Sequence, residues 1–160
     1  RMKHLPKHLR PRWRYVAVGI ETWPDADVGR RAFQRALWYA AGNLVGDAGS
    51  ADADLSLLSF AYADGRGEAV VRVRHGHVAE ARASIACVSE VDGEPVGIRV
   101  RGISGTVRAC EERYMGRAGG TSTQRDVAFE DAERPAVVRG DACDVRTESG
   151  HVGATTFDIE

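Results

Sequence analysis

The sequence predicts an α+β fold, a sandwich of a β-sheet and helices with the element order β-α-β-β-α-β. Three observations carry this prediction. Apolar residues alternate with polar ones in four segments, and they recur at helical spacing in two longer segments between them. Asp-Gly pairs stand where the chain must turn back between expected strands. This order is that of ferredoxin-like and RRM-like sandwiches.

The first strand and first helix show these patterns most clearly. Residues 13–22 alternate as a strand does, and Asp27 is a suitable helix cap. The helix then runs to Val45 and stops at Gly46, with its core stripe at Phe33, Ala36, Leu37, Ala40 and Leu44. The remaining expected elements are strands over 55–62 and 69–74, a helix over 78–88, a strand over 96–103 and an additional C-terminal helix over 106–115.

Charge divides the chain into three parts. Residues 1–12 form a basic leader, 13–115 the sandwich domain and 116–160 an acidic tail. Residues 1–115 carry 17 basic and 14 acidic side chains, whereas residues 116–160 carry 5 and 9. The tail contains Gly and is weakly periodic, so it is expected to be flexible and largely disordered, with one short strand over 136–139.

The amino-terminal leader predicts a polyanionic partner. The first fourteen residues hold six Lys or Arg, two His and no acid. Basic segments attached to a folded domain commonly neutralise phosphate backbones, because each neutralised phosphate releases a counterion. The leader lacks the continuous apolar stretch of an export signal, and no run reaches the roughly 20 apolar residues of a membrane span. Three Cys without C-x-x-C spacing favour a reducing, cytoplasmic setting.

Alternation along the strands predicts a cationic sheet face. Residues that do not point to the two helices must point to the opposite face. Such a face is typical of nucleic-acid binding, although charges on edge strands also discourage aggregation. Only two of the 22 basic residues are Lys, which suits phosphate recognition but is explained more readily by a GC-rich coding bias. The residues expected on this face are Trp13, Tyr15, Arg72, Arg74, Arg99 and Arg101.

The third strand does not carry the aromatic platform of an RNA-recognition motif. The segment reads RGEAVVRV, which keeps the Arg-Gly start of that motif. Glu68, Val70 and Val73 stand where the motif places aromatic rings. RNA binding is therefore expected to rely on phosphate and shape, with Tyr15 or Trp13 as the evident stacking positions.

Three segments resemble the Pop5 family of archaeal ribonuclease P proteins. They read KHLRPRWRYVAVGIE, FQRALWYAAGNLVGDAGSAD and GIRVRGISGTVRACEERYM. The resemblance covers about residues 2–115 and implies an RRM-like sandwich with no catalytic group and no cofactor of its own. It implies that a ribonuclease P RNA, with Mg²⁺, removes the 5′ leader of precursor tRNA. The implied protein partners are ribonuclease P protein component 3, of TIM-barrel-like fold, and the other ribonuclease P proteins.

The resemblance also transfers RNA contact to particular residues. It assigns no role to the acidic tail, which departs from the family pattern. Abundant Asp and Ala with scarce Lys further indicate a halophilic, haloarchaeal source. The residues that match the leader motif and the motif after the last strand are Lys7, Arg10, Arg12, Arg14, Tyr15, Thr106 and Arg108.

A second apolar stripe on the first helix predicts a docking surface for the protein partner. Trp38, Ala41 and Val45 lie about 100° from the core stripe. So wide an apolar arc indicates either docking or a helix sunk deeper into its own core, and the sequence leaves both open.

Other functions are weighed against this one. A protein–protein module of ferredoxin-like fold without an RNA-binding role is the main alternative, and a regulatory small-ligand domain is a third. The pairs Asp25/Asp27 and Asp52/Asp54 could suggest metal-dependent nuclease chemistry, but Asp is common in turns and caps. No metal site is predicted.

Overall fold

The structure is a computed structural model that separates into two units, Arg1–Gly116 and Arg117–Glu160. The first unit contains the predicted sandwich, and the second contains the acidic tail. The described residues are 6–116, 122–129, 132–139, 142–147 and 150–155.

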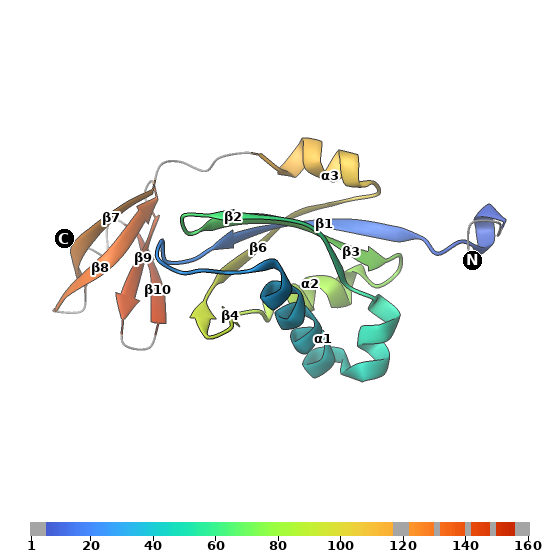
Figure 1. Cartoon of the computed structure of the whole chain (residues 1–160), viewed down its shortest axis with the longest axis horizontal. Coiled ribbons are helices and arrows are strands. Elements are labelled where there is room, and N and C mark those ends of the chain that lie inside the picture. Colours follow the sequence, from blue (N-terminus) through green and yellow to red (C-terminus); the bar gives the residue numbers. More distant parts are fainter. Residues whose placement is uncertain (1–5, 117–121, 130–131, 140–141, 148–149, 156–160) are drawn as a thin grey trace. The chain divides into compact units, whose positions relative to one another are not determined.

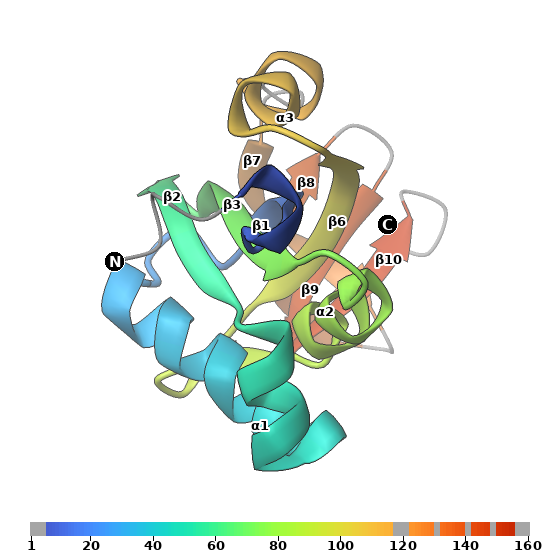
Figure 2. The same cartoon turned by 90° about the vertical axis from the view of Figure 1, so that its right-hand side faces the viewer.

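The first unit is built on a four-stranded antiparallel sheet with the order β2-β3-β1-β6. Helices α1 (Arg30–Ala53) and α2 (Val78–Ala86) cover one face, and α3 (Val107–Tyr114) lies on the other (Figures 1 and 2). The predicted β-α-β-β-α-β order and the additional helix are confirmed. The strands are β1 (Trp13–Glu21), β2 (Ser56–Ala63), β3 (Arg66–Arg74) and β6 (Gly97–Ser104).

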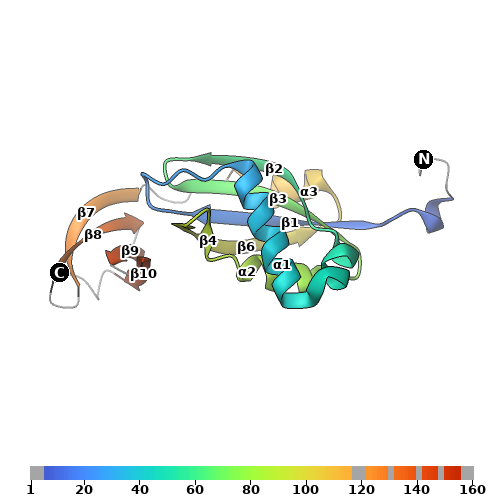
Figure 3. The same ribbon diagram turned by 60° about the horizontal axis from the view of Figure 1, so that its bottom comes forward.

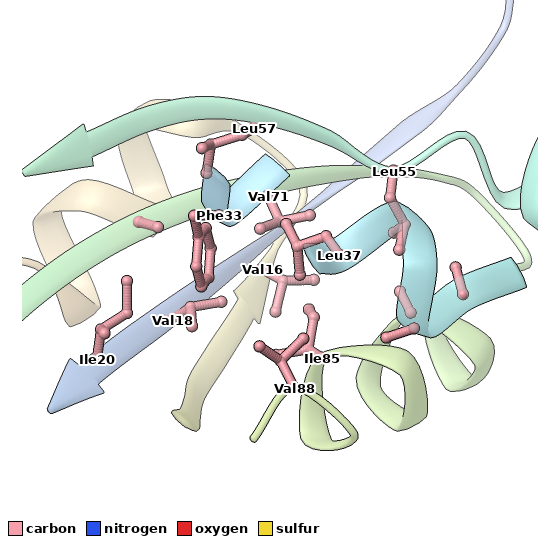
Figure 4. Close-up of a cluster of buried hydrophobic side chains, with 14 of the residues drawn as sticks. Val16, Val18, Ile20, Phe33, Leu37, Leu55, Leu57, Val71, Ile85 and Val88 are labelled. Atoms are coloured by element: carbon pink, nitrogen blue, oxygen red, sulfur yellow. The ribbon is translucent and has the colours of Figure 1, made fainter. Parts of the chain in front are cut away.

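The main core lies between the sheet and the pair α1 and α2. Phe33 and Leu37 of α1 and Ile85 of α2 are fully buried against the strands (Figure 4). Figure 3, from the side of these helices, shows α1 crossing in front of the sheet. Val16, Val18 and Ile20 alternate toward this core, as the sequence predicts.

Two Asp-Gly turns set the pairing of the strands that they join. Asp64 and Gly65 have φ values of 51° and 80°, the left-handed pair that a two-residue hairpin turn requires. Pairing therefore continues to the turn, and β3 starts at Arg66, three residues before its predicted start. The second pair, Asp92-Gly93, joins two short strands that the prediction lacks, β4 (Glu90–Val91) and β5 (Glu94–Pro95).

Helix α1 bends at the residue where the sequence predicts its end. Gly46 has φ 76° and ψ 172°, a conformation outside the helical region that glycine adopts without steric penalty. Helical turns resume beyond it to Ala53, because this alanine is buried (1% exposed) and anchors them. At its start, Gly29 rather than the predicted Asp27 is the N-cap.

The tail is a sheet in the structure, which differs from the predicted disorder. Its strands form an antiparallel meander with the order β10-β9-β8-β7. Ala136 of β8 and Val145 of β9 are fully buried and lie opposite each other in register, so the unit buries side chains on one face. Part of the predicted linker, 117–121, lies outside the described residues. The strands are β7 (Ser122–Phe129), β8 (Ala132–Arg139), β9 (Ala142–Thr147) and β10 (Gly150–Thr155).

Candidate nucleic-acid interface

Helix α3 covers the middle of the sheet face that the sequence predicts to be open. Ala17 of β1, Val70 of β3 and Cys110 of α3 form a small buried cluster there, and Tyr15 packs against it. Burial, followed by the nearby Glu111 charge, raises the pKa of the Cys110 thiol. Tyr15 is thus half-buried beneath α3, and the central positions where an RNA-recognition motif stacks bases are occupied by protein.

Small residues on the strands make room for this helix. A Cβ atom at Gly102 would lie 2.1 Å from Cζ of Tyr114, so the Tyr114 ring rests directly on the β6 backbone. Gly19 similarly accommodates the Arg101 guanidinium, whose Nε would be 2.9 Å from an added Cβ. The outer face is therefore shaped to receive α3 and Arg101.

A local ion pair engages Arg101, one of the predicted RNA contacts. Its Nη1 donates to the Glu68 carboxylate at 2.6 Å, and the backbone N–H of Gly116 donates to the same carboxylate at 3.0 and 3.1 Å. Arg101 Nη1 also donates to the Tyr114 carbonyl at 3.3 Å. We call these interactions the α3 latch, because they tie the end of α3 to the sheet. The charge of Arg101 is therefore compensated within the protein.

The other predicted contacts gather mainly at one end of the sheet. Trp13 lies opposite Arg74, and Tyr15 lies opposite Ser104, so the start of β1, the end of β3 and the end of β6 coincide (Figure 1). The leader enters this end, and α3 begins there. We call it the cationic end, and its predicted RNA contacts are Lys7, Arg10, Arg12, Arg14, Arg72, Arg74, Thr106 and Arg108.

A tryptophan organises two of these arginines. Cζ of Arg72 lies 3.9 Å from the centroid of the Trp13 ring, and Cζ of Arg74 lies 5.3 Å from it. Both distances are within cation–π range. Arg74 also faces Asp54 at 3.9 Å, a distance too long for a hydrogen bond.

The leader is joined to the cationic end through its backbone. The short 3-10 helix η2 (Lys7–Leu9) precedes it, and the Arg12 carbonyl accepts from the His75 N–H at 2.8 Å. Arg10 and Arg12 are exposed, whereas Arg14 is half-buried on the α1 side of the sheet. The side chain of Lys7 lies outside what the structure describes.

The start of α3 contributes the remaining two predicted contacts. Thr106 is the N-cap of α3, where its Oγ1 accepts from the Ala109 N–H at 3.1 Å. Arg108 is exposed and pairs with Glu112 at 2.9 Å within the helix. Arg99 does not join this group, because it lies opposite Gly19, toward the far end of the sheet. The structure thus separates Arg99 and Arg101 from the other predicted RNA contacts.

The predicted partner stripe on α1 does not form one exposed surface. Ala41 is 1% exposed and belongs to the core, so it cannot meet a partner in this conformation. Val45 is half-buried against Gly49, and Trp38 is 53% exposed. Ala41 is therefore part of the protein core and not of a partner surface, and the prediction of a docking stripe is wrong at this residue.

Trp38 instead belongs to a row of side chains that covers the edge strand β2. Trp38 Nε1 donates to the Leu55 carbonyl at 2.8 Å, and Arg30 Nη2 donates to the Leu57 carbonyl at 2.8 Å. Between them, Gln34 Oε1 accepts from the Leu57 N–H at 2.7 Å. These contacts satisfy backbone groups that an edge strand would otherwise expose.

Other exposed apolar residues of α1 lie away from Trp38, at a groove of about 610 Å³ between α1 and the segment 87–93. Tyr39 (73% exposed) and Leu44 (46%) line it from α1. The sequence places Leu44 in the core stripe, but in the structure Leu44 is exposed and lines this groove instead.

Metal ligands do not gather in the part of the chain that the structure describes. Among those residues, no three His, Cys, Asp or Glu side chains lie together as metal ligands. Of the Asp pairs considered above, Asp54 is the left-handed C-cap of α1. No helix of the described segments combines the length and apolar character of a membrane span.

Two side chains that shape this surface have roles that the sequence pattern does not predict. Glu68 enters the prediction only as a missing aromatic, and its role as the partner of Arg101 depends on a cross-strand position. Trp13 is predicted on the outer face, but its stacking on Arg72 and Arg74 is not. The sequence could in principle predict this stacking, because outward-facing residues at the paired ends of β1 and β3 must lie next to each other.

Haloarchaeal proteins are similar to this chain over nearly its whole length, and a methanogen protein is similar over a shorter part. The chain is 82% identical, over 99% of its own length and 100% of the relative's, to ribonuclease P protein component 2 of Halorubrum lacusprofundi. It is 58% identical to the protein of that name from Haloarcula marismortui, over 99% of each chain. A relative of the same name from Methanosarcina barkeri is 28% identical over 71% of this chain and 80% of its own.

A solved structure and a family model give two further matches. In a cryo-electron microscopy structure of yeast ribonuclease MRP, one chain matches with a TM-score of 0.45 and 19% identity, over 59% of this chain and 75% of that one. The family model described as the Rpp14/Pop5 family matches residues 14–115, which span β1 to the end of α3. On this match and on the haloarchaeal relatives, the chain belongs to the Rpp14/Pop5 family.

Proposed function

We propose that this chain is a non-catalytic protein subunit of ribonuclease P that binds the ribonuclease P RNA through its cationic end. Its relatives carry the name ribonuclease P protein component 2, and the family matches the whole sandwich. The observation that carries the proposal is the convergence of the leader, the end of β3 and the start of α3 at one end of the sheet. Arginines placed there can meet one phosphate backbone together.

The role of the protein would be electrostatic and positional. In this proposal the RNA, with Mg²⁺, removes the 5′ leader of precursor tRNA, and the protein lowers repulsion between the approaching phosphates. Arg10 and Arg12 of the leader are exposed and so can reach phosphates directly. No chemical step is assigned to a side chain of this protein.

A reconstituted holoenzyme tests the proposal. Replacing Arg10, Arg12 and Arg108 by Gln should weaken binding of the ribonuclease P RNA and lower the slope of log affinity against log salt by about 0.7 to 0.9 for each phosphate that the variant no longer neutralises. Arg82→Gln is the matched control, because Arg82 is an exposed arginine on α2, outside the cationic end. Equal affinity and turnover of the triple variant and the wild type would refute the proposal.

Protein partners are the second part of the proposal. Ribonuclease P protein component 3 would dock on the groove beside α1, because the most exposed aromatic residue of that helix, Tyr39, lies there with Leu44. The Arg35–Asp92 ion pair, at 3.4 Å, lies at the same groove and provides a polar margin. The other ribonuclease P proteins would join this core assembly.

Calorimetric titration of this chain with component 3 tests the docking. Tyr39→Asp should reduce affinity at least tenfold, since a charge then enters an apolar contact. Leu58→Asp changes an exposed apolar residue (36%) on the edge strand outside the groove and should leave affinity unchanged. If the Tyr39→Asp variant binds component 3 as tightly as the wild type does, the docking surface does not lie at this groove.

The groove also favours the alternative, a protein–protein module without an RNA-binding role. Removing residues 2–12 discriminates between the two. Loss of a gel shift with the ribonuclease P RNA, with component 3 binding intact, supports the RNA-binding subunit. No gel shift by either form, with component 3 binding intact, favours the plain protein–protein module, whereas an equal gel shift by both forms places the RNA contacts outside the leader.

A further inference from the structure

Arg72 differs from the structural arginine on the same sheet face. Arg101 is held by Glu68 at 2.6 Å, and its charge is neutralised. Arg72, also directed to the α3 side, forms no ion pair or side-chain hydrogen bond with any described residue, and its Nε is buried without an acceptor. Its described contact is the face of Trp13, 3.9 Å away.

The stacking geometry leaves the hydrogen-bonding edge of a guanidinium available. A ring covers the face of the guanidinium plane, whereas the N–H groups lie in that plane; because Nε of Arg72 is buried, the fork offered to an anion is the pair of terminal Nη groups. Stacking also restricts the side-chain rotamers, so less conformational entropy is lost when an anion binds. A planar fork held in this way suits bidentate contact with a phosphate.

A second guanidinium stands beside the first. Arg74 is two residues further along β3, about 6.6 Å away along the strand, and approaches the same ring at 5.3 Å. Its nearest acid, Asp54, is 3.9 Å away and half-exposed. Two guanidinium charges next to one aromatic ring outnumber the single carboxylate of Asp54, which pairs with Arg74 at 3.9 Å, so the site keeps a net positive charge that an anion would balance.

We propose that Trp13, Arg72 and Arg74 form a clamp for phosphodiester groups of the RNA backbone, in which Trp13 is a positioning residue that holds the two guanidiniums. This inference rests on the proposed function and deepens it. It assigns Trp13 to the arginines rather than to a nucleobase, which is the other group that an aromatic side chain stacks on in RNA complexes.

A double-mutant cycle separates these two roles of Trp13. Affinity for the in vitro transcribed ribonuclease P RNA is measured by filter binding at fixed salt. Trp13→Ala should weaken binding by about 2- to 30-fold, the range of a cation–π contact. In an Arg72→Ala, Arg74→Ala background the same change should alter affinity less than about twofold. An equal loss in both backgrounds would overturn the clamp and indicate a direct contact of Trp13 with RNA.

Conservative variants guard against loss of folding. Trp13→Phe keeps a ring and should retain part of the affinity, and Arg72→Lys keeps the charge but loses the fork and should weaken binding. Arg82→Lys is the matched control and should bind as the wild type does. Circular dichroism establishes folding for each protein. If Arg72→Lys and Trp13→Phe both bind like the wild type, the clamp is refuted.

Failure of the clamp can be told apart from failure of the proposed function. The triple Gln variant at Arg10, Arg12 and Arg108 leaves the three clamp residues unchanged. If that variant loses affinity while Trp13→Ala does not, the cationic end binds RNA and the clamp is wrong. If neither variant loses affinity, the RNA interface itself lies elsewhere, and both proposals fall.

Discussion

The packing of α3 against the sheet at Gly102 can be tested by adding a single methyl group at that residue. Gly102→Ala would place a Cβ atom 2.1 Å from Cζ, 2.3 Å from Cε1 and 2.5 Å from Cε2 of Tyr114. Carbon atoms in contact lie about 3.5 to 4.0 Å apart, so the ring must move by more than about 1 Å. The α3 latch holds the Tyr114 carbonyl and Gly116 to the sheet, so the ring must yield by leaving its rotamer or by lifting the end of α3 against these bonds.

The size of the effect follows from the small contact area of α3. Cys110 is the buried residue of this helix, and Tyr114 and Met115 are half-buried. Overpacking typically costs about 1 to 3 kcal/mol. If all of that free energy acts on the docking equilibrium, the undocked population of α3 rises about 5- to 150-fold.

Labelling of Cys110 measures this equilibrium, because its thiol is fully buried when α3 is docked. The experiment uses a Cys87→Ser, Cys143→Ser background, so that one thiol remains to react at fixed pH. Gly105→Ala is the control, since an added Cβ there has no neighbour within 4 Å. The labelling rate should rise with Gly102→Ala and stay unchanged with Gly105→Ala. Equal rates in both variants and the parent would show that α3 is not seated on Gly102.

Three further measurements test other parts of the fold. Glu68→Gln should lower the free energy of unfolding, measured in urea, by about 1 to 3 kcal/mol, because Arg101 loses its charged partner. Glu112→Gln, at the exposed pair with Arg108, is the control and should change it by less than about 1 kcal/mol. Trp38→Phe should cost about 0.5 to 1.5 kcal/mol by removing the donor to the Leu55 carbonyl just before β2, and unaltered stability would show that this bond contributes nothing. The pKa of Cys110 is raised above its ordinary value of 9.0, so its stabilising contribution is present below that pH and declines as the pH rises through the raised pKa. Cys110→Ser should therefore flatten stability against pH above about 9, and an identical pH dependence in both proteins would contradict this sign.

Local sequence patterns predicted the elements of the sandwich because each one is nearly independent of distant contacts. Alternation in β1 and the Asp64-Gly65 turn are properties of a few neighbouring residues. The ends of elements were predicted less well, because tertiary contacts decide them. Burial of Ala53 extends α1 beyond Gly46, and pairing up to the turn extends β3 back to Arg66.

The candidate interface was predicted in composition but not in arrangement. Alternation placed Arg72 and Arg101 on one face, but it could not show that Glu68 neutralises one and Trp13 stacks on the other. These differences arise from the register between strands that are distant in sequence. For the same reason Ala41, apolar and at helical spacing, could not be assigned to core or surface from the sequence alone.

The tail shows a different limit of sequence patterns. Its strands mix Arg and Asp with apolar residues, so composition favoured disorder. Order in the structure comes from pairing of consecutive strands, such as Ala136 opposite Val145. The haloarchaeal relatives align over 98 to 99% of the chain, tail included, whereas the Methanosarcina relatives align over 71%. The tail is thus a feature shared with the haloarchaeal relatives of this chain.

The position of α3 and the stacking of Trp13 have a common consequence for RNA binding. Because α3 fills the centre of the sheet face, cationic contacts are confined to the sheet end and the leader. If six such groups each met a phosphate, affinity would fall about as the fifth power of salt concentration. Exposed leader charges are screened within about 3 Å at about 1 M salt, but a contact with an aromatic face is short and partly shielded from solvent. In the proposed interface, we therefore expect the arginines held by Trp13 to keep more of their contribution in strong salt than the exposed leader arginines do, and the salt dependence of the Trp13→Ala and leader variants would show this difference.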